Sequence, residues 1–318
     1  MKDHPKIIFF GTPDFAVASL EALINAEYNV IGVVTAPDKP SGRGMHLKSS
    51  PVKQYALKKG LHLLQPENLK DPQFLKELKN LLPDLQVVVA FRMLPVEVWS
   101  MPPLGTFNLH ASLLPHYRGA APINWAIING EKETGVTTFF INEKIDTGNI
   151  IYSRKTWIDP EETAGELHDR LMKTGAELVI ETVAAIASRE AQVVSQDLLM
   201  PDIIDMKKAP KIFKERCRID WNDTVANIYN FIRGMSPSPC AYTTLTSSDG
   251  TPHYLKIYKA KPEFLFHNFP PGQILTDGHS YLKIAVRDGF IQLSEIQPAG
   301  RKALSIADFL RGVRTRFT

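Results

Sequence analysis

Short apolar runs alternate with amphipathic stretches through the first two-thirds of the chain, and this alternation limits the fold more than any other feature. The runs IIFF at 7–10 and VVV at 87–89 are apolar at every position, so neither face of these strands suits water. Such strands, separated by helices, are typical of a parallel sheet covered on both faces. We therefore predict an α/β domain with helices on both faces of a mostly parallel sheet. Its strands are expected at residues 6–11, 29–35, 61–64, 85–91, 105–110 and 135–141.

Two of the predicted helices have recognisable starts. Thr12, Pro13 and Asp14 combine an N-cap residue, a proline in the first turn and an acid at the positive end of the helix dipole. This helix should end near Ala26. A longer helix should begin near residues 161–163, because the apolar positions that follow keep a period of about 3.6 residues. These positions are Leu167, Leu171, Leu178, Val183 and Ile186.

The pattern changes after residue 196. Between residues 197 and 210 the helical period lapses and two prolines bracket DIIDMKKA, which indicates a linker. After a helical stretch near 225–234, short alternating runs are separated by Asp-Gly and Pro-Gly turns, which predicts a small antiparallel barrel. A last helix is expected over residues 305–316. We therefore predict domains at 1–196 and 211–318, joined by a linker at 197–210.

Charge is distributed unevenly, although the formal net charge is only +3. Residues 210–318 hold 15 Lys and Arg against 9 Asp and Glu, an excess of 6 positive charges, whereas residues 1–209 hold 22 against 25. A basic excess in one region favours a polyanion as the partner of that region. A basic face that contacts only solvent explains the same counts, so both interpretations stay open.

Composition excludes several classes of protein. Of the 318 residues, 44% are hydrophobic and 22% are charged, which is typical of a globular chain with a sizeable core. Cys217 and Cys240 form no CxxC pair and the nine His show no HExxH spacing, so we expect no metal site. No apolar run is long enough for a membrane span or a secretion signal. We expect a monomeric, cytoplasmic protein that does not enter membranes.

The familiar phosphate and nucleophile motifs are missing from the sequence. The first predicted strand leads into GTPDFA, which lacks the second and third glycines of a dinucleotide-binding fingerprint, and Gly42 and Gly44 have no third partner either. The sequence contains neither a GxxxxGK[ST] loop nor a GxSxG elbow. NAD-dependent oxidoreductases, P-loop ATPases and α/β-hydrolases are therefore poor interpretations.

The predicted strand at 105–110 carries two polar side chains on one face. Positions two apart in a strand point the same way, so Asn108 and His110 project together and Leu109 points to the opposite face. The pair lies at the carboxyl end of the strand, where open α/β sheets bind ligands. The strand therefore predicts a candidate active site, with a packing role for either side chain as the alternative.

Asp146 supplies a possible third member of this site, in an Asp-Thr-Gly turn after the run at 135–141. The spacing from His110 accommodates a loop, a helix and a returning parallel strand, which would bring Asp146 beside His110. An amide, an imidazole and a carboxylate together can stabilise an oxyanion and transfer a proton. A simple turn-forming role for Asp146 explains the same motif.

Two longer segments, NLHASLLPHYRGAAPI at 108–123 and IDTGNIIY at 145–152, resemble the formyltransferase family that uses 10-formyltetrahydrofolate. The shared features are an Asn-x-His, a Ser-Leu-Leu-Pro loop and a downstream Asp. Further segments resemble the branch of the family that acts on charged initiator tRNA; these lie at 7–23, 35–53, 209–221 and 296–312. The resemblance covers nearly the whole chain. It implies a Rossmann-like catalytic domain followed by an OB-like barrel that helps to hold tRNA.

The resemblance also implies roles for individual residues. Asn108, His110 and Asp146 match the catalytic set of the family. The folate-binding candidates match two segments, namely Ser112, Leu113, Leu114 and Pro115, together with Phe91, Arg92, Met93 and Leu94. The candidates for contact with tRNA are basic residues of the 35–53 segment and of the C-terminal region. They are Arg43, Lys48, Lys53, Lys211, Lys214, Arg301 and Lys302, with Arg311 and Arg314 as further basic positions.

One segment departs from the family pattern. VVVAFRMLP at 87–95 looks one residue shorter than the usual version, which contains tyrosine and glycine, and Arg92 stands where glycine is more common. This segment lies against the pterin in the family. The departure therefore bears on the folate contacts around Phe91–Leu94 and not on catalysis.

The implied activity is transfer of the formyl group from 10-formyltetrahydrofolate to the α-amino group of methionine on initiator tRNA. The amine attacks directly, so neither a covalent enzyme intermediate nor a metal is expected. One alternative is formyl transfer on the same core to glycinamide ribonucleotide or a sugar amine, which the basic loop and the barrel argue against. A tRNA-binding protein without activity is another alternative, which the intact Asn108, His110 and Asp146 set argues against.

Overall fold

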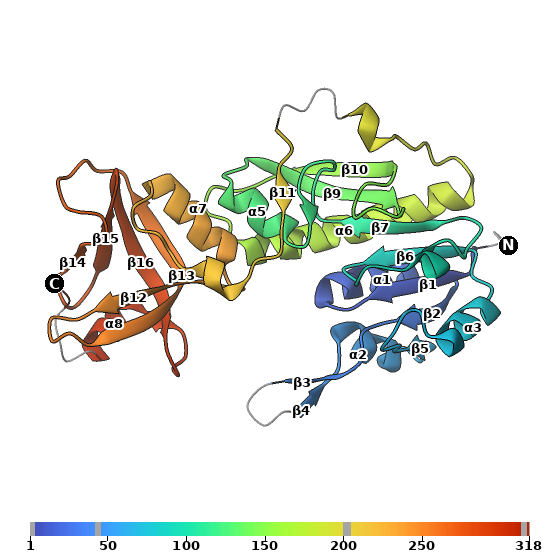
Figure 1. Ribbon diagram of the computed structural model, residues 1–318, viewed down its shortest axis with the longest axis horizontal. Coiled ribbons are helices and arrows are strands. Elements are labelled where there is room, and N and C mark those ends of the chain that lie inside the picture. Colours follow the sequence, from blue (N-terminus) through green and yellow to red (C-terminus); the bar gives the residue numbers. More distant parts are fainter. Residues whose placement is uncertain (1–3, 42–45, 200–204, 313–316, 318) are drawn as a thin grey trace. The chain divides into compact units, whose positions relative to one another are not determined.

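The structure of the protein, a computed structural model, describes residues 4–41, 46–199, 205–312 and 317 (Figure 1). The chain forms two compact units, each built from segments that are distant in the sequence. The first unit comprises residues 1–119, 134–156 and 168–208, and the second comprises residues 120–133, 157–167 and 209–318. The functional domains expected at 1–196 and 211–318 stay a prediction.

A seven-stranded sheet forms the centre of the first unit, with the strand order β10-β9-β7-β6-β1-β2-β5. The pairs β5–β2, β2–β1, β1–β6 and β6–β7 are parallel, which confirms the predicted mostly parallel α/β sheet. The strands are β1 Ile7–Gly11, β2 Val30–Val34, β5 Leu63–Leu64, β6 Leu85–Val89, β7 Thr106–His110, β9 Glu133–Phe140 and β10 Ile150–Trp157.

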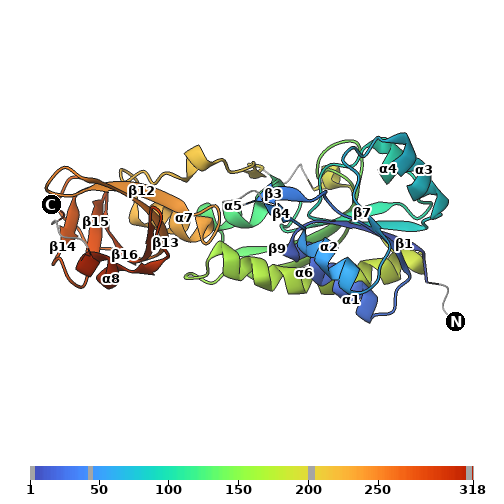
Figure 2. The ribbon, with the colours of Figure 1, turned by 90° about the horizontal axis from the view of Figure 1, so that it is seen from below.

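Helices cover both faces of this sheet, as predicted. Figure 2 shows α1, α2 and α6 on one side and α3 and α4 on the other. The helices are α1 Asp14–Asn25, α2 Pro51–Lys58, α3 Pro72–Asn80, α4 Val96–Trp99 and α6 Ala164–Ala187.

The unbroken apolar run of β1 reflects this double coverage. Ile8 and Phe10 belong to a core cluster that includes Phe74 and Leu78 of α3, whereas the intervening Phe9 is fully buried outside that cluster. Successive side chains of β1 point to opposite faces of the sheet, and both faces are buried. Every position of the strand is therefore apolar.

The two predicted helix starts had different outcomes. The long helix α6 begins at Ala164, next to the expected range 161–163. Thr163 caps it: its Oγ1 accepts the backbone N–H of Glu166 at 3.3 Å, and the Glu166 carboxylate accepts the backbone N–H of Thr163 at 2.8 Å. These hydrogen bonds form a capping box and lower the pKa of Glu166. The expected cap at Thr12 is wrong, because α1 begins one residue later, after Pro13, which has no side chain able to cap it.

The strand that returns beside β7 runs in the opposite direction to the one expected. In the antiparallel β7–β9 pair, His110 lies opposite Thr137 and Phe107 lies opposite Phe140. The strand therefore ends beside the start of β7 and not beside His110. The prediction of a parallel return was wrong, because β9 runs antiparallel to β7. The loop after β9, rather than the strand itself, brings Asp146 back to His110.

The segment at 35–53 contains a short antiparallel hairpin, which the sequence did not predict. Its strands are β3 Lys39–Ser41 and β4 His46–Lys48. Two contacts join the residues that precede the hairpin to the residues that follow it. Thr35 Oγ1 lies 2.8 Å from Ser50 Oγ, and Lys53 Nζ lies 2.7 Å from the Asp38 carboxylate.

The second unit contains a curled antiparallel sheet with the strand order β12-β13-β16-β15-β14, and β17 pairs with β16 (Figure 1). The expected small barrel is an open half-barrel, since within the described residues no pairing joins the end strands β12 and β14. The strands are β12 Ala241–Thr246, β13 Pro252–Glu263, β14 Ile274–Thr276, β15 Leu282–Val286, β16 Gly289–Pro298 and β17 Leu304–Ser305, with the helix α8 at Ile306–Gly312.

Two helices from distant parts of the sequence pack together in the second unit. They are α5, Pro122–Ile128, and α7, Val225–Met235. The side-chain amide of Asn124 donates to the carbonyl oxygen of Gly234 at 2.7 Å, and the Trp125 indole N–H donates to the carbonyl oxygen of Pro210 at 2.8 Å. The helix that follows the candidate active-site loop therefore belongs to the same compact unit as the C-terminal region.

Replacing Gly148 with alanine should destabilise the protein. A Cβ atom there would lie 1.6 Å from the carbonyl oxygen of Phe140, and a backbone atom cannot move away without distorting β9. We expect a loss of about 1–3 kcal/mol in the free energy of unfolding, measured by denaturant titration. Asn149→Ala is the matched control, since Asn149 is the exposed neighbour. Equal unfolding midpoints for Gly148→Ala and wild type would contradict the close approach.

Candidate active site

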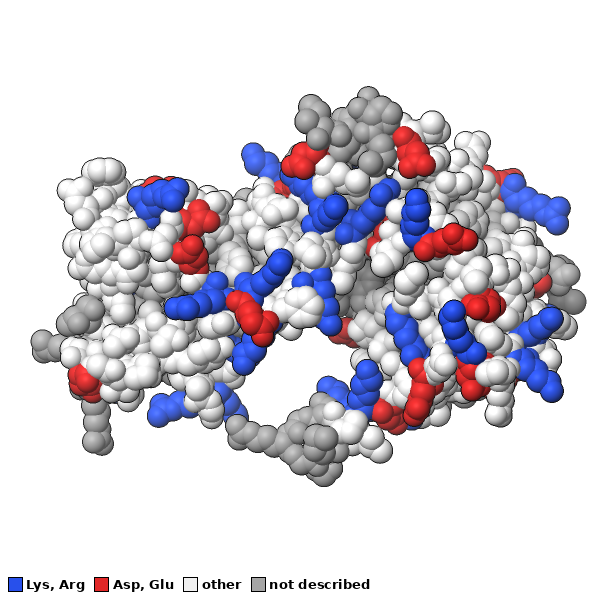
Figure 3. Space-filling view, in the orientation of Figure 1, with Lys and Arg blue, Asp and Glu red and all other residues white. Residues whose placement is uncertain are grey.

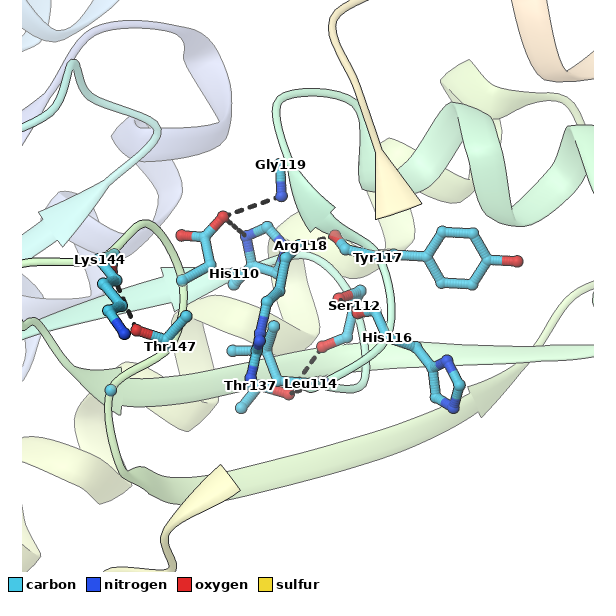
Figure 4. A network of polar contacts seen from close by, with 12 residues as sticks. His110, Ser112, Leu114, His116, Tyr117, Arg118, Gly119, Thr137, Lys144 and Thr147 are labelled. Carbon is cyan, nitrogen blue, oxygen red and sulfur yellow. Dashed lines mark hydrogen bonds and ion pairs between the residues drawn. The ribbon is translucent and has the colours of Figure 1, made fainter. Parts of the chain in front are cut away.

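His110 ends strand β7 and is buried, with an exposed side-chain fraction of 7%. Its Nε2 atom lies 2.8 Å from the carbonyl oxygen of Tyr117 (Figure 4). A carbonyl oxygen can only accept, so Nε2 carries a proton and donates it. The ring is therefore held in one orientation, with the Nδ1 side of the imidazole available to take part in a reaction.

Asp146 lies on that side of the ring. Its Oδ2 atom is 4.0 Å from His110 Nδ1 and accepts the backbone N–H of Gly119 at 2.9 Å. A separation of 4.0 Å is too long for a hydrogen bond but short enough for a strong electrostatic interaction with a charged imidazole. The structure thus brings together the imidazole and the carboxylate that the sequence singled out.

Both groups that face the imidazole come from residues in the left-handed region of backbone conformation. Tyr117 has a φ of 59° and Asp146 has a φ of 54°. Non-glycine residues adopt this conformation at a cost of about 1–3 kcal/mol, and it persists where surrounding contacts hold it. The backbone N–H of Tyr117 donates to the carbonyl oxygen of Lys207 at 2.7 Å, which is one such contact.

Asn108 lies two residues before His110 on β7, so the two side chains share one face of the sheet. Its side chain is half-buried and makes no hydrogen bond within the part of the chain that the structure describes. A half-buried amide of this kind can donate to a ligand without first breaking a contact. The arrangement can therefore place an amide N–H, an imidazole and a carboxylate around one reacting group.

Gln196, which no sequence pattern singled out, supports this arrangement. Its side-chain N–H groups donate to the carbonyl oxygens of Asp146 at 3.0 Å and Gly148 at 2.8 Å. Its Oε1 accepts two hydrogen bonds from the Arg118 guanidinium, at 3.1 and 2.7 Å. Burial lowers the pKa of Arg118, and the nearby Asp197 and Asp146 carboxylates oppose that shift. Only its position after a predicted helix could have drawn attention to this lone glutamine.

Thr137 of β9 fixes the backbone of the Ser-Leu-Leu-Pro loop through two hydrogen bonds. The hydroxyl of Thr137 donates to the carbonyl oxygen of Ser112 at 2.7 Å and accepts the backbone N–H of Leu114 at 3.3 Å. The Ser112 hydroxyl donates to the carbonyl oxygen of His116, so it stabilises the loop (Figure 4). Leu114 and Pro115 are buried, whereas Leu113 is half-buried. Folate binding by this loop stays a prediction.

The segment Phe91–Leu94 follows β6 and is divided between core and surface. Phe91 packs edge-on against Phe10, and Leu94 is buried in the same cluster. Met93 is exposed. The Arg92 guanidinium donates to the carbonyl oxygen of Glu67 at 2.7 Å and to that of Pro66, and burial lowers its pKa. Arg92 thus ties this segment to the loop after β5, which a glycine could not do.

The basic residues predicted to contact tRNA differ in their surroundings. Lys53 is paired with Asp38, whereas most of the others are exposed. On the face drawn in Figure 3, Lys and Arg are spread over the C-terminal part with acidic side chains between them. Arg43 and Arg314 lie outside the described residues. The exposed candidates are Lys48, Lys211, Lys214, Arg301, Lys302 and Arg311.

Two structural features that mark other functional classes are missing from the described residues. No group of three or more His, Cys, Asp and Glu is clustered there so as to hold a metal ion. None of the described helices is long and apolar enough to cross a bilayer. Cys217 and Cys240 are buried free thiols, and burial raises the pKa of Cys240 to about 11.

Two family models match this chain. One described as "Formyl transferase" matches residues 5–183, and one described as "Formyl transferase, C-terminal domain" matches residues 211–314.

Curated relatives match over nearly the full length of the chain. A methionyl-tRNA formyltransferase of Parabacteroides distasonis is 55% identical over 314 residues, which cover 98% of this chain and 97% of that protein. One of Phocaeicola vulgatus is 55% identical over 315 residues, which cover 99% of this chain and 97% of that protein.

Solved structures of lower identity share the fold. An N-formyltransferase from Helicobacter canadensis, in complex with folinic acid and dTDP-3-aminofucose, has a TM-score of 0.65 and 22% identity, covering 92% of this chain and 99% of that chain. HypX from Aquifex aeolicus, in complex with tetrahydrofolic acid, has a TM-score of 0.65 and 20% identity, covering 98% of this chain and 48% of that chain.

Replacing Gln196 with alanine should displace Asp146 from His110. The change leaves the carbonyl oxygens of Asp146 and Gly148 without their side-chain donor, which costs about 1–3 kcal/mol for buried groups. We expect a lower unfolding midpoint together with a lower turnover number. Leu198→Ala is the control, because Leu198 is close in sequence and strongly exposed. Wild-type turnover in Gln196→Ala would show that the glutamine does not position the carboxylate.

Proposed function

Since the chain belongs to the formyl transferase family, we propose that it transfers the formyl group of 10-formyltetrahydrofolate to the α-amino group of methionine on initiator tRNA. The observation that carries the choice of acceptor is the 55% identity to methionyl-tRNA formyltransferases over 98% of the chain. The buried His110 beside Asp146 supports the chemistry, because acyl transfer requires stabilisation of an oxyanion and removal of a proton.

The proposed reaction is a direct attack of the amine on the formyl carbon. A carbon–nitrogen bond forms, and the formyl oxygen becomes an oxyanion that accepts hydrogen bonds from the Asn108 amide and from Nδ1–H of protonated His110. The intermediate then collapses by breaking the bond between the formyl carbon and N10 of the folate. The amine loses one proton and N10 gains one. Asp146 stabilises the charged imidazole and helps to transfer the proton.

The folate contacts are proposed at two loops beside this set. The first is Ser112–Pro115, whose backbone is fixed by Thr137, and the second is Phe91–Leu94. The side chains of Phe91 and Leu94 pack in the core, so backbone groups and the exposed Arg92 and Met93 are the parts that remain for folate. Arg92 holds the second loop in place through its hydrogen bonds to the loop after β5.

The tRNA contacts are proposed at the hairpin segment and in the C-terminal region. The candidates in the hairpin segment are Arg43, Lys48 and Lys53. The candidates in the C-terminal region are Lys211, Lys214, Arg301 and Lys302. Contacts of this kind are made to phosphates, so binding weakens as salt concentration rises.

The proposed organisation assigns catalysis to residues 1–196 and tRNA binding to residues 211–318, with 197–210 as a linker. The protein is proposed to act as a monomer in the cytoplasm.

A comparison of acceptors tests the proposed function. The enzyme is supplied with 10-formyltetrahydrofolate and either charged initiator tRNA or glycinamide ribonucleotide, and the formylated product is measured. We expect formylation of the charged tRNA alone. Formylation of glycinamide ribonucleotide would identify a different transferase built on the same core, and tRNA binding without formylation would identify a binding protein.

Substitutions of the two site residues test the proposed mechanism. We expect His110→Ala and Asp146→Asn each to lower the turnover number by about 10²–10³, because each removes a group that stabilises the charged intermediate. Asp146→Asn keeps an oxygen that accepts the Gly119 N–H, so its fold should be retained. Circular dichroism and the unfolding midpoint check that both variants are folded. Turnover close to wild type in either folded variant contradicts the proposed roles.

A further inference from the structure

The loop between β13 and β14 exposes a group of large apolar side chains. Phe264 is 68% exposed, Leu265 is 54% exposed and Phe266 is 87% exposed. We call these three residues the apolar tip. Exposed apolar groups of this size cost free energy in water, and contiguous ones mark a surface that contacts another molecule. Neither the proposed catalytic set nor the proposed folate contacts use them.

His267, which directly follows the tip, is anchored to strand β16. The His267 Nε2–H donates to the carbonyl oxygen of Gly289 at 2.7 Å, and His267 Nδ1 accepts the backbone N–H of Phe269 at 3.1 Å. The His267 ring stacks on Phe290, with 4.3 Å between ring centroids. The residue that follows the tip is therefore fixed against Phe290 of β16, whereas the three residues of the tip stay exposed.

The strand that leads to the tip, β13, carries two exposed lysines, of which Lys259 lies opposite Glu295 of β16 and Lys261 lies opposite Gln292. The one acidic residue between them and the tip, Glu263, is neutralised by Lys283, whose Nζ lies 3.0 Å from both carboxylate oxygens. A partner for this surface should combine negative charge with flat apolar faces. Nucleic acids have both, since phosphates bind lysine and bases stack on aromatic rings.

We propose that the apolar tip stacks on unpaired bases of the RNA substrate, while Lys259 and Lys261 contact the adjacent phosphates. This inference rests on the proposed function, which supplies the RNA. It adds a contact made through base faces to the phosphate contacts already proposed. Because stacking depends on ring faces rather than on base edges, the contact requires exposed bases and does not select a particular one.

Substitutions of Phe266 distinguish stacking from other uses of the tip. Binding of charged initiator tRNA is measured by fluorescence titration for Phe266→Ala, Phe266→Leu and Phe266→Trp. Loss of one stacked base costs about 1–3 kcal/mol, so alanine should weaken binding by about 5- to 150-fold. Leucine should weaken it similarly, because it keeps the apolar area but lacks a flat face. Tryptophan should bind within about threefold of wild type, because it keeps a ring face.

Steady-state kinetics and a matched control complete the test. For Phe266→Ala we expect the KM for charged tRNA to rise while kcat and the KM for 10-formyltetrahydrofolate stay unchanged. Leu57→Ala is the control, because Leu57 is an exposed apolar residue of α2 outside the loop. Unchanged circular dichroism is expected for all variants, since the replaced side chain packs little against the fold.

Three outcomes would overturn the inference. Wild-type tRNA affinity in Phe266→Ala and Phe266→Leu would show that the tip does not touch RNA. Affinity that is lost with alanine but retained with leucine would indicate apolar docking without stacking. Tip-dependent binding to vesicles of anionic phosphatidylglycerol, or tip-dependent dimerisation, with tRNA affinity unchanged would assign the tip to a membrane or to a second copy of the chain. Failure of the wild-type enzyme to formylate tRNA would instead reject the proposed function.

Discussion

The candidate active site depends on the hydrogen bond between the backbone N–H of Gly119 and the Asp146 carboxylate, 2.9 Å long. Gly119 lies in the short strand β8, Arg118–Gly119, which follows β7 in the chain, and Asp146 lies in the loop after β9. The bond joins these two segments above the strand that carries His110, and it holds the carboxylate 4.0 Å from Nδ1 of the imidazole. Asp146 would otherwise sit in a turn whose preceding residues are exposed, free to point into solvent.

The remaining contacts around the site restrict the same two segments. Tyr117 fixes the far nitrogen of the imidazole through its carbonyl oxygen, and Gln196 fixes the backbone on both sides of Thr147. Donors and charges that are already in position need not reorganise when charge develops on a substrate, which is how preorganised sites stabilise such states. This property suits the proposed reaction, in which the acceptor amine attacks the formyl carbon directly and no covalent enzyme intermediate forms.

Much of the architecture could be predicted from local pattern. The apolar run of β1 predicted a strand buried on both faces, and the 3.6-residue apolar period that starts at Leu167 predicted the long helix α6. The errors arose where the pattern is not local. An apolar run has no direction, so the antiparallel course of β9 could not be read from it. Gln196 was missed because a single glutamine has no sequence signature before its partners are known.

The α/β class, the change to antiparallel strands after residue 210 and the resemblance that drew attention to Asn108, His110 and Asp146 all follow from the sequence. Each of these depends on residues that are neighbours along the chain. Three features became visible only in the folded chain: the loop after β9 brings Asp146 back to His110, the half-barrel is open, and Phe266 is exposed. These features depend on contacts between residues far apart in the sequence, where packing and hydrogen bonding override local preference.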